Sequence, residues 1–266
     1  MGSIYDVFHY TCFINLSNDK ALERFTFYMW TVKSESGRLK AVLIQESIEQ
    51  FWAQKLPFIG VESSTLYLPR CPHADLNGGR EQWKVLPKLL KEEGVQVFEV
   101  KSILKDTLDN ASLKERKDIV KAVWADLSDA PEPTDLRIDH LLSGYPTKPY
   151  YNKDTDMVVL PDFQRVSWPY PRDTSFTTQL GTVICNMRRY SRRFEPRVVK
   201  LCYDYDSTLK EKIEVIFDAN EFNLGLTEQL CIEGGDTHIL DEETIAIGVG
   251  QRSTFTGFIE TTKKLF

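Results

Sequence analysis

A regular alternation of apolar and polar positions begins after residue 37 and switches between the periods of strands and helices. Leu39–Ile44 and Val95–Val100 are short apolar runs with the length of buried strands. Between them, Glu81–Glu93 has apolar residues spaced to line one face of a helix, and Gly94 follows as a stop signal. These apolar residues are Val85, Leu86, Leu89 and Leu90. Strand, helix and strand in this order predict an α/β unit.

A mainly helical block is expected next, from about residue 103 to residue 150. Its clearest helix runs over Ser112–Asp126, with Ser112 placed to cap the helix together with Glu115. The apolar side of that helix consists of Ile119, Val120, Val123, Trp124 and Leu127. A shorter helix is predicted near Asp135–Leu142, and Met157–Leu160 then resumes the sheet. The pattern therefore predicts an α/β fold that carries a helical insert.

The first 36 residues form an extension in front of this regular pattern. It contains the β-prone run Phe25–Val32, which predicts an edge strand, followed by the polar segment Lys33–Gly37. We therefore divide the chain into an extension, residues 1–36, and one domain, residues 37–266.

Composition narrows the range of partners. With 266 residues, 42% of them apolar, the chain can bury a substantial core, and its net charge of -6 argues against binding to nucleic acid. No stretch approaches the roughly 20 apolar residues of a membrane-spanning helix, and the N-terminus lacks a signal peptide, so we expect a cytoplasmic protein. The five cysteines are scattered without C-x-x-C spacing, which predicts reduced thiols, no metal site and no cofactor.

Four segments in the second half of the chain carry the residues of chemical interest. In order, they are Pro171-Arg172-Asp173-Thr174, Met187 with Arg188, Arg189, Arg192 and Arg193, Ile232-Glu233-Gly234-Gly235-Asp236, and Ala246-Ile247-Gly248-Val249-Gly250-Gln251-Arg252-Ser253. Together they resemble the arginine deiminase family of guanidine-modifying enzymes, whose chains carry a T-R-D strand end, a Met-plus-arginine segment, an E-G-G-D turn and a G-x-G-x-R-S strand end. The resemblance extends to residues 37–44 and covers most of 37–266. It implies an α/β propeller of ββαβ-type modules, of which this chain would form a part.

The resemblance also implies roles for individual residues. Asp173 and Glu233 align with the carboxylates that grip the substrate guanidinium, a planar cation that carboxylates meet with paired hydrogen bonds. Arg192 aligns with the arginine that binds the substrate α-carboxylate, which favours arginine over agmatine. Supporting roles fall to Arg172, Gly234, Gly235, Asp236 and Arg252.

Each of these residues also has a purely structural interpretation. Asp173 alone would be a surface ion-pair partner of Arg172, and Arg192 one solvated charge among four arginines. The two glycines after Glu233 suit any tight turn. Only the occurrence of all four segments in the family's order favours the functional interpretation.

Family members attack the guanidinium carbon with a cysteine of a G-G-x-H-C-type segment, helped by an H-x-D pair. Neither occurs before the chain stops at Phe266, so no catalytic residue is assigned. Cys231 is predicted to be core packing. His238 and Asp241 are three residues apart, and in a strand such residues face opposite sides.

These observations leave several functions open. The first is an arginine deiminase-like hydrolase of free arginine, for which this chain holds the substrate-binding half-site without being active alone. The alternatives are a noncatalytic arginine-binding or protein-interaction module, an agmatine deiminase and an amidinotransferase. Because part of a propeller would leave strand edges open, we also expect self-association or pairing with a C-terminal fragment.

Overall fold

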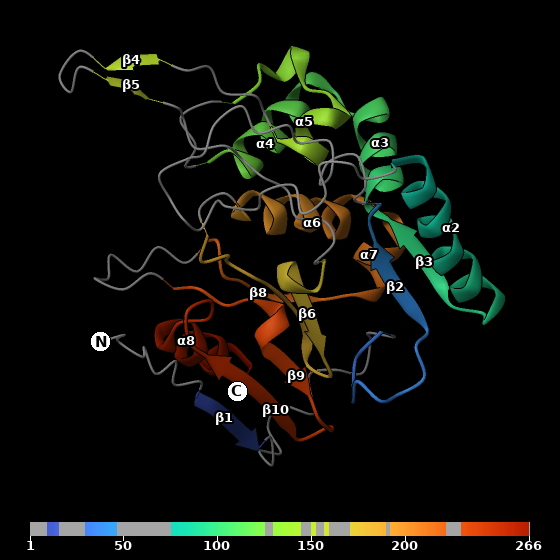
Figure 1. Ribbon diagram of the computed structural model, residues 1–266, viewed down its shortest axis with the longest axis vertical. Coiled ribbons are helices and arrows are strands. Elements are labelled where there is room, and N and C mark those ends of the chain that lie inside the picture. Colours follow the sequence, from blue (N-terminus) through green and yellow to red (C-terminus); the bar gives the residue numbers. More distant parts are fainter. Residues whose placement is uncertain are drawn as a thin grey trace. The chain divides into compact units, whose positions relative to one another are not determined.

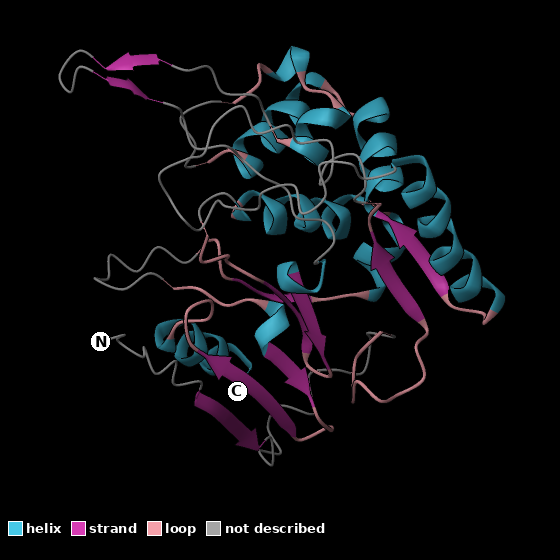
Figure 2. Ribbon diagram, in the orientation of Figure 1, coloured by secondary structure: helices cyan, strands magenta, loops and turns pink. Residues whose placement is uncertain are grey.

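The computed structural model describes residues 10–15, 30–46, 76–125, 130–144, 150–152, 157–159, 171–189, 192–221 and 230–265. They belong to two compact units that alternate along the chain. The first unit comprises residues 1–38, 172–188 and 207–266, and the second comprises residues 39–171 and 189–206. Helices and strands occur in both units, so the predicted α/β class is confirmed (Figures 1 and 2).

Two three-stranded sheets form the first unit. One is antiparallel, in the order β1-β10-β9, and the other has the order β6-β7-β8, with β6 antiparallel and β8 parallel to β7. The strands are β1 (Tyr10–Asn15), β6 (Ser175–Thr178), β7 (Gly181–Ile184), β8 (Val215–Asp218), β9 (Thr237–Ile239) and β10 (Thr244–Val249). The helices of this unit are α7 (Ser207–Lys212) and α8 (Phe255–Leu265). Gly181 makes the tight turn into β7, with φ of +134° and no room for a Cβ, which would lie 2.6 Å from Ile216.

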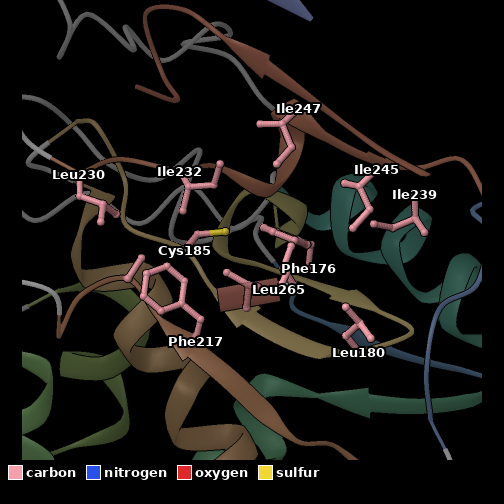
Figure 3. Packing of buried hydrophobic residues seen from close by; sticks show 12 residues of the cluster. Phe176, Leu180, Cys185, Phe217, Leu230, Ile232, Ile239, Ile245, Ile247 and Leu265 are labelled. Atoms are coloured by element: carbon pink, nitrogen blue, oxygen red, sulfur yellow. The ribbon is translucent and has the colours of Figure 1, made fainter. Parts of the chain in front are cut away.

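One apolar cluster joins these sheets to α8 (Figure 3). Its side chains come from β6, β7, β8, β9, β10, α8 and the connecting segments next to them, and each is at most 7% exposed. The members are Phe176, Leu180, Val183, Cys185, Phe217, Ala219, Leu230, Ile232, Ile239, Ile245, Ile247 and Leu265. This core fixes the strand ends from which the site residues extend.

The second unit contains the predicted β-α-β arrangement. β2 (Ala41–Ile44) and β3 (Gln96–Glu99) pair in parallel, and α2 (Leu76–Glu92) lies between them in sequence. The predicted strands and helix are therefore confirmed, although the apolar stripe of α2 is not fully buried. Three of its residues remain about half exposed, namely Val85, Leu86 and Leu89.

The helical block is also confirmed, and it starts directly after β3. It consists of α3 (Val100–Asn110), α4 (Leu113–Val123), the short 3-10 helix η3 (Pro133–Asp135) and α5 (Ile138–Ser143). Ser112 caps α4 as predicted, because its Oγ accepts the Glu115 N–H while the Glu115 carboxylate accepts the Ser112 N–H. Leu127 lies outside the described residues.

A further helix, later in the sequence, packs against this block and was not predicted. α6 (Phe194–Tyr205) packs against α3 and α4. The rings of Phe194 and Trp124 lie 5.4 Å apart, and Arg197 donates to the carbonyl oxygen of Val123 at 3.3 Å. The second unit is thus closed by a helix far away in sequence.

Two strand predictions need correction. Met157–Val159 is indeed a strand, β5, but it pairs antiparallel with β4 (Tyr150–Asn152) and does not resume the sheet of β2 and β3. Only residues 153–156 separate β4 from β5, so a local hairpin is the pairing within reach.

The extension contributes a strand, but at a different place from the one predicted. β1 pairs with all six residues of β10. Most of the run predicted as an edge strand, residues 25–29, lies outside the described residues, and Trp30–Val32 is not a strand. Val32 instead donates its N–H to the carbonyl oxygen of Thr178 at 3.3 Å.

Among the described helices, none combines the length and apolar character needed to cross a membrane.

Candidate functional site

Arg172 joins two short turns of the first unit. It lies in the 3-10 turn η4 (Pro171–Thr174), and its Nε donates to the carbonyl oxygen of Gly234 at 3.2 Å. Its Nη2 donates to the carbonyl oxygen of Thr237 at 2.6 Å. These acceptors lie at the start and just beyond the end of the turn η6 (Gly234–Asp236). The Arg-Asp and Glu-Gly-Gly-Asp segments, distant in sequence, are therefore neighbours, and both form turns that precede strands.

Glycine is required where these two turns meet. A Cβ at position 234 would lie 2.1 Å from the carbonyl oxygen of Arg172, and one at position 235 would lie 2.3 Å from Oδ1 of Asp173. The carboxylate of Asp173 thus lies directly against the backbone of Gly235. The two glycines therefore allow the two turns to approach each other closely, and their role in substrate binding stays a prediction.

Glu233 is held by two groups from other segments. Its side chain is buried, and Oε1 accepts the backbone N–H of Arg188 at 3.1 Å. Nη1 of Arg252 contacts Oε1 at 3.4 Å and Oε2 at 3.2 Å. These hydrogen bonds compensate the buried carboxylate for the loss of water.

Ser253 connects the ends of the Glu-Gly-Gly-Asp segment. Its Oγ accepts the N–H of Glu233 at 3.0 Å and donates to Oδ2 of Asp236 at 2.6 Å. Ser253 is fully buried. Ser253 had no predicted role. Its place directly after Arg252, within the family-like segment, was the one sequence feature that pointed to it.

Cys185 lies close to both predicted guanidinium-binding carboxylates. Burial raises the pKa of its thiol well above the usual range, and the negative charges of Glu233 and Asp173 raise that pKa further. The thiol is therefore protonated and unsuited to act as a nucleophile.

The other cysteines with described side chains are packed in the core. Cys231 is fully buried, as predicted, and its carbonyl oxygen accepts the N–H of Thr254 at 2.9 Å. Cys202 in α6 is buried, and this burial raises the pKa of its thiol. His238 contacts Glu35 while Asp241 accepts the N–H of Glu243, so that histidine and that aspartate do not converge, again as predicted.

Glu35, from the extension, contacts the Arg172 turn and was missed from the sequence. Its carboxylate accepts hydrogen bonds from the Arg172 side chain and from the N–H of Ile239, and it lies 3.3 Å from Nδ1 of His238. Burial alone would raise the pKa of Glu35, but these hydrogen bonds and the charge of Arg172 outweigh it and lower the pKa. The only sequence signal was its place two residues before Gly37, where the resemblance begins.

Arg192 belongs to the second unit and is almost fully buried there. Its Nε lies 3.0 Å from Oε1 of Glu195, and its Nη2 lies 2.8 Å from Oε2, in a paired arrangement. Arg192 is therefore not a solvated charge. Its binding of a substrate carboxylate stays a prediction.

The other predicted site residues all lie in the first unit, around η4 and η6. They are Arg172, Asp173, Glu233, Gly234, Gly235, Asp236 and Arg252. Within the described part of the chain, no three His, Cys, Asp or Glu side chains are grouped in a way that suits a metal ion. The candidate site therefore contains two carboxylates, with arginine side chains and backbone N–H groups around them.

The chain is similar in sequence to known arginine deiminases. Residues 148–266 match the family model described as arginine deiminase. The chain is 24% identical to the arginine deiminase of Limosilactobacillus fermentum, 24% to that of Pediococcus pentosaceus and 25% to that of Staphylococcus haemolyticus. Each comparison covers 88% of this chain and 59% of the relative, so the chain spans a little over half the length of these relatives. The chain is therefore similar to arginine deiminases over most of its length, and the family match covers its C-terminal part, residues 148–266.

Proposed function

We propose that this chain binds the guanidinium of free arginine as the substrate-binding half-site of an arginine deiminase-type hydrolase. The overall reaction consumes arginine and water and releases citrulline and ammonia. The observation that supports the proposal most directly is the close contact between η4, which contains Asp173, and η6, which directly follows Glu233. The similarity to arginine deiminases supports the same chemistry, and the propeller fold that this similarity implies is part of the proposal.

The carboxylates suit a guanidinium for two reasons. A guanidinium remains charged at any physiological pH and offers paired N–H groups, which match the two oxygens of a carboxylate. Glu233 already pairs with one guanidinium, that of Arg252, and is held in place by the N–H of Arg188. A carboxylate fixed in advance loses little conformational entropy when a ligand binds.

Arg192 is proposed to recognise the α-carboxylate of the substrate. This assignment comes from its alignment with the family and not from its contacts, since its guanidinium already forms a pair with Glu195. It predicts a preference for arginine over agmatine, which lacks the carboxylate. An agmatine deiminase or an amidinotransferase would show a different ligand preference.

A noncatalytic arginine-binding module is the second candidate. The thiols of Cys185, Cys202 and Cys231 are all buried, and none of these three residues is placed as a nucleophile. Binding and hydrolysis are therefore separate questions for this chain. Citrulline release distinguishes the two candidates, because only the hydrolase produces it.

Isothermal titration calorimetry of the chain with arginine and with agmatine tests the proposal. We expect Asp173→Asn to weaken arginine binding about tenfold or more, because a charge-assisted hydrogen bond is replaced by a neutral one. Glu233→Gln should have a similar effect. The matched control is Asp241→Asn, an exposed residue of the same unit whose carboxylate accepts the N–H of Glu243 at 2.8 Å.

Two results would contradict the proposal. One is a wild-type chain that is folded and binds neither arginine nor agmatine. The other is equal binding by wild type and by Asp173→Asn and Glu233→Gln. An unfolding midpoint measured for every variant separates loss of binding from loss of the fold.

A further inference from the structure

We infer that Glu35 is a positioning residue for guanidinium binding. Its carboxylate holds Arg172, and through Arg172 it holds the two turns that carry Asp173 and Glu233 in register. This inference rests on the proposed function and extends it to the N-terminal extension, residues 1–36. Three steps lead from Glu35 to the carboxylates.

The first step is the attachment of Glu35 to β9. Its backbone N–H donates to the carbonyl oxygen of Ile239 at 3.0 Å, and its Oε1 accepts the N–H of the same residue at 3.1 Å. Both backbone polar groups of Ile239 are thus satisfied by one residue, as a neighbouring strand would satisfy them. The side chain of Glu35 is therefore fixed at both ends and does not move freely.

The second step is the grip of Glu35 on Arg172. The guanidinium of Arg172 reaches the Glu35 carboxylate, the carbonyl oxygen of Gly234 and that of Thr237. A guanidinium is a rigid fork, so fixing one of its nitrogens fixes the direction of the others. The carboxylate also supplies the negative charge that two neutral carbonyl groups lack. Removing it would leave the Arg172 side chain less firmly oriented on η6.

The third step is the contact between η4 and η6. Asp173 follows Arg172 directly, and its Oδ1 lies against Gly235, while the carbonyl oxygen of Arg172 lies against Gly234. Because Asp173 lies in η4 and Glu233 directly precedes η6, a shift of η4 against η6 would displace the two carboxylates relative to each other. A binding site needs its groups held within about 0.5 Å of their working positions. Glu35 meets this need without being placed on the ligand.

The same segment provides a matched control. Lys33, two residues before Glu35, forms an exposed ion pair with Glu242 at 3.1 Å. This pair ties the segment to the loop that follows β9, and neither of its residues belongs to η4 or η6. Replacing Lys33 therefore loosens the same segment without removing the proposed link.

The experiment compares Glu35→Ala, Glu35→Gln and Lys33→Ala by calorimetry with arginine and with agmatine. We expect Glu35→Ala to weaken both ligands by the same factor, on the order of tenfold, the size typical of residues that orient a binding group. Glu35→Gln keeps one oxygen that accepts from Arg172 or from Ile239 but loses the charge, so its affinity should lie between those of Glu35→Ala and the wild type. Lys33→Ala should bind both ligands as the wild type does.

Hydrogen exchange followed by mass spectrometry provides a second measurement that needs no ligand. In Glu35→Ala and Glu35→Gln, the amides of residues 172–175 and 234–239 should exchange faster, whereas in Lys33→Ala they should exchange at the wild-type rate. Peptides from α3 and α4 in the second unit serve as an internal reference. Faster exchange throughout the chain would indicate general loss of stability and would count against a positioning role.

The outcomes separate this inference from the proposed function. If wild type binds arginine and Glu35→Ala binds both ligands equally well, the inference is wrong and the proposed function stands. Equal losses in Glu35→Ala and Lys33→Ala also overturn it. If wild type binds neither ligand, the proposed function fails, and exchange at the two turns in Glu35→Gln against Lys33→Ala still decides whether Glu35 positions them.

Discussion

Arg192 and Glu195 form a buried ion pair, with side chains 3% and 0% exposed. Taking two charges out of water is costly, and the pair is stable only because each partner compensates the other. The residue that the family assigns to substrate binding is thus also part of the packing of the second unit. Loss of arginine binding on mutation of Arg192 is therefore informative only beside agmatine binding and a stability measurement.

We predict that Arg192→Ala lowers the free energy of unfolding by about 3 to 5 kcal/mol, because it leaves the Glu195 carboxylate buried without its partner. The double variant Arg192→Ala with Glu195→Ala should lose less than the sum of the two single variants. Urea unfolding measures all three. Lys200→Ala, which breaks the more exposed pair with Asp204, is the control and should cost at most about 1 kcal/mol. An Arg192→Ala variant as stable as this control would contradict the buried-pair interpretation.

The family-like segments gave predicted roles to Asp173, Glu233 and Arg252, but they gave none to the residues that contact these segments in three dimensions. Glu35 and Ser253 act by reaching particular backbone N–H and carbonyl groups. Which backbone groups lie within reach is decided by the fold, so a sequence pattern carries little trace of it.

At the scale of elements, the turns η4 and η6 depend on glycine at their contact. Gly234 faces the carbonyl oxygen of Arg172, a backbone atom that cannot rotate away. Gly250, at the end of β10, has no atom within 4 Å of the position of an added Cβ. The two glycines lie in two of the family-like segments, yet only one of them is sterically required.

We predict that Gly234→Ala lowers the free energy of unfolding by about 1 to 3 kcal/mol through overpacking, and that it also weakens arginine binding. Gly250→Ala should leave both quantities close to those of wild type. Thermal unfolding and calorimetry on the two variants measure this difference. Equal behaviour of the two variants would show that the contact between the turns is not as tight as described.

Helix α4 was predicted from the sequence, whereas helix α6 was not. α4 has a clear apolar side, with Ile119 and Val123 buried. α6 buries the charged residues Glu195 and Arg197 together with its apolar ones. Charged residues are mostly exposed in proteins, so the burial of these two does not follow from the sequence pattern.

At the scale of the whole molecule, the apolar stripe of α2 bears on association. Val85, Leu86 and Leu89 are 52%, 46% and 52% exposed. A run of exposed apolar side chains on one helix favours association in water. The expected self-association of the chain therefore has a candidate surface in α2 as well as in the strand edges.

We predict that sedimentation velocity at rising protein concentration shows species larger than the 30.7 kDa of one chain. The variant Leu86→Glu with Leu89→Glu should sediment as a smaller species at the same concentration, because charge replaces the apolar stripe. Lys84→Glu, on the same helix and exposed, controls for added negative charge. A concentration-independent monomer in the wild type would remove the basis for this prediction.

The amino-acid order alone was enough to predict the α/β class, the helices that follow β3 and the capped helix α4. These features depend on local periodicity and on residue type, and both can be read along the chain. The pairing of β1 with β10, the packing of α6, the burial of Arg192 against Glu195 and the link from Glu35 through Arg172 to η6 emerged only in three dimensions. Each of these features joins segments, or buries groups, through contacts that depend on how the whole chain packs, and no local pattern specifies them.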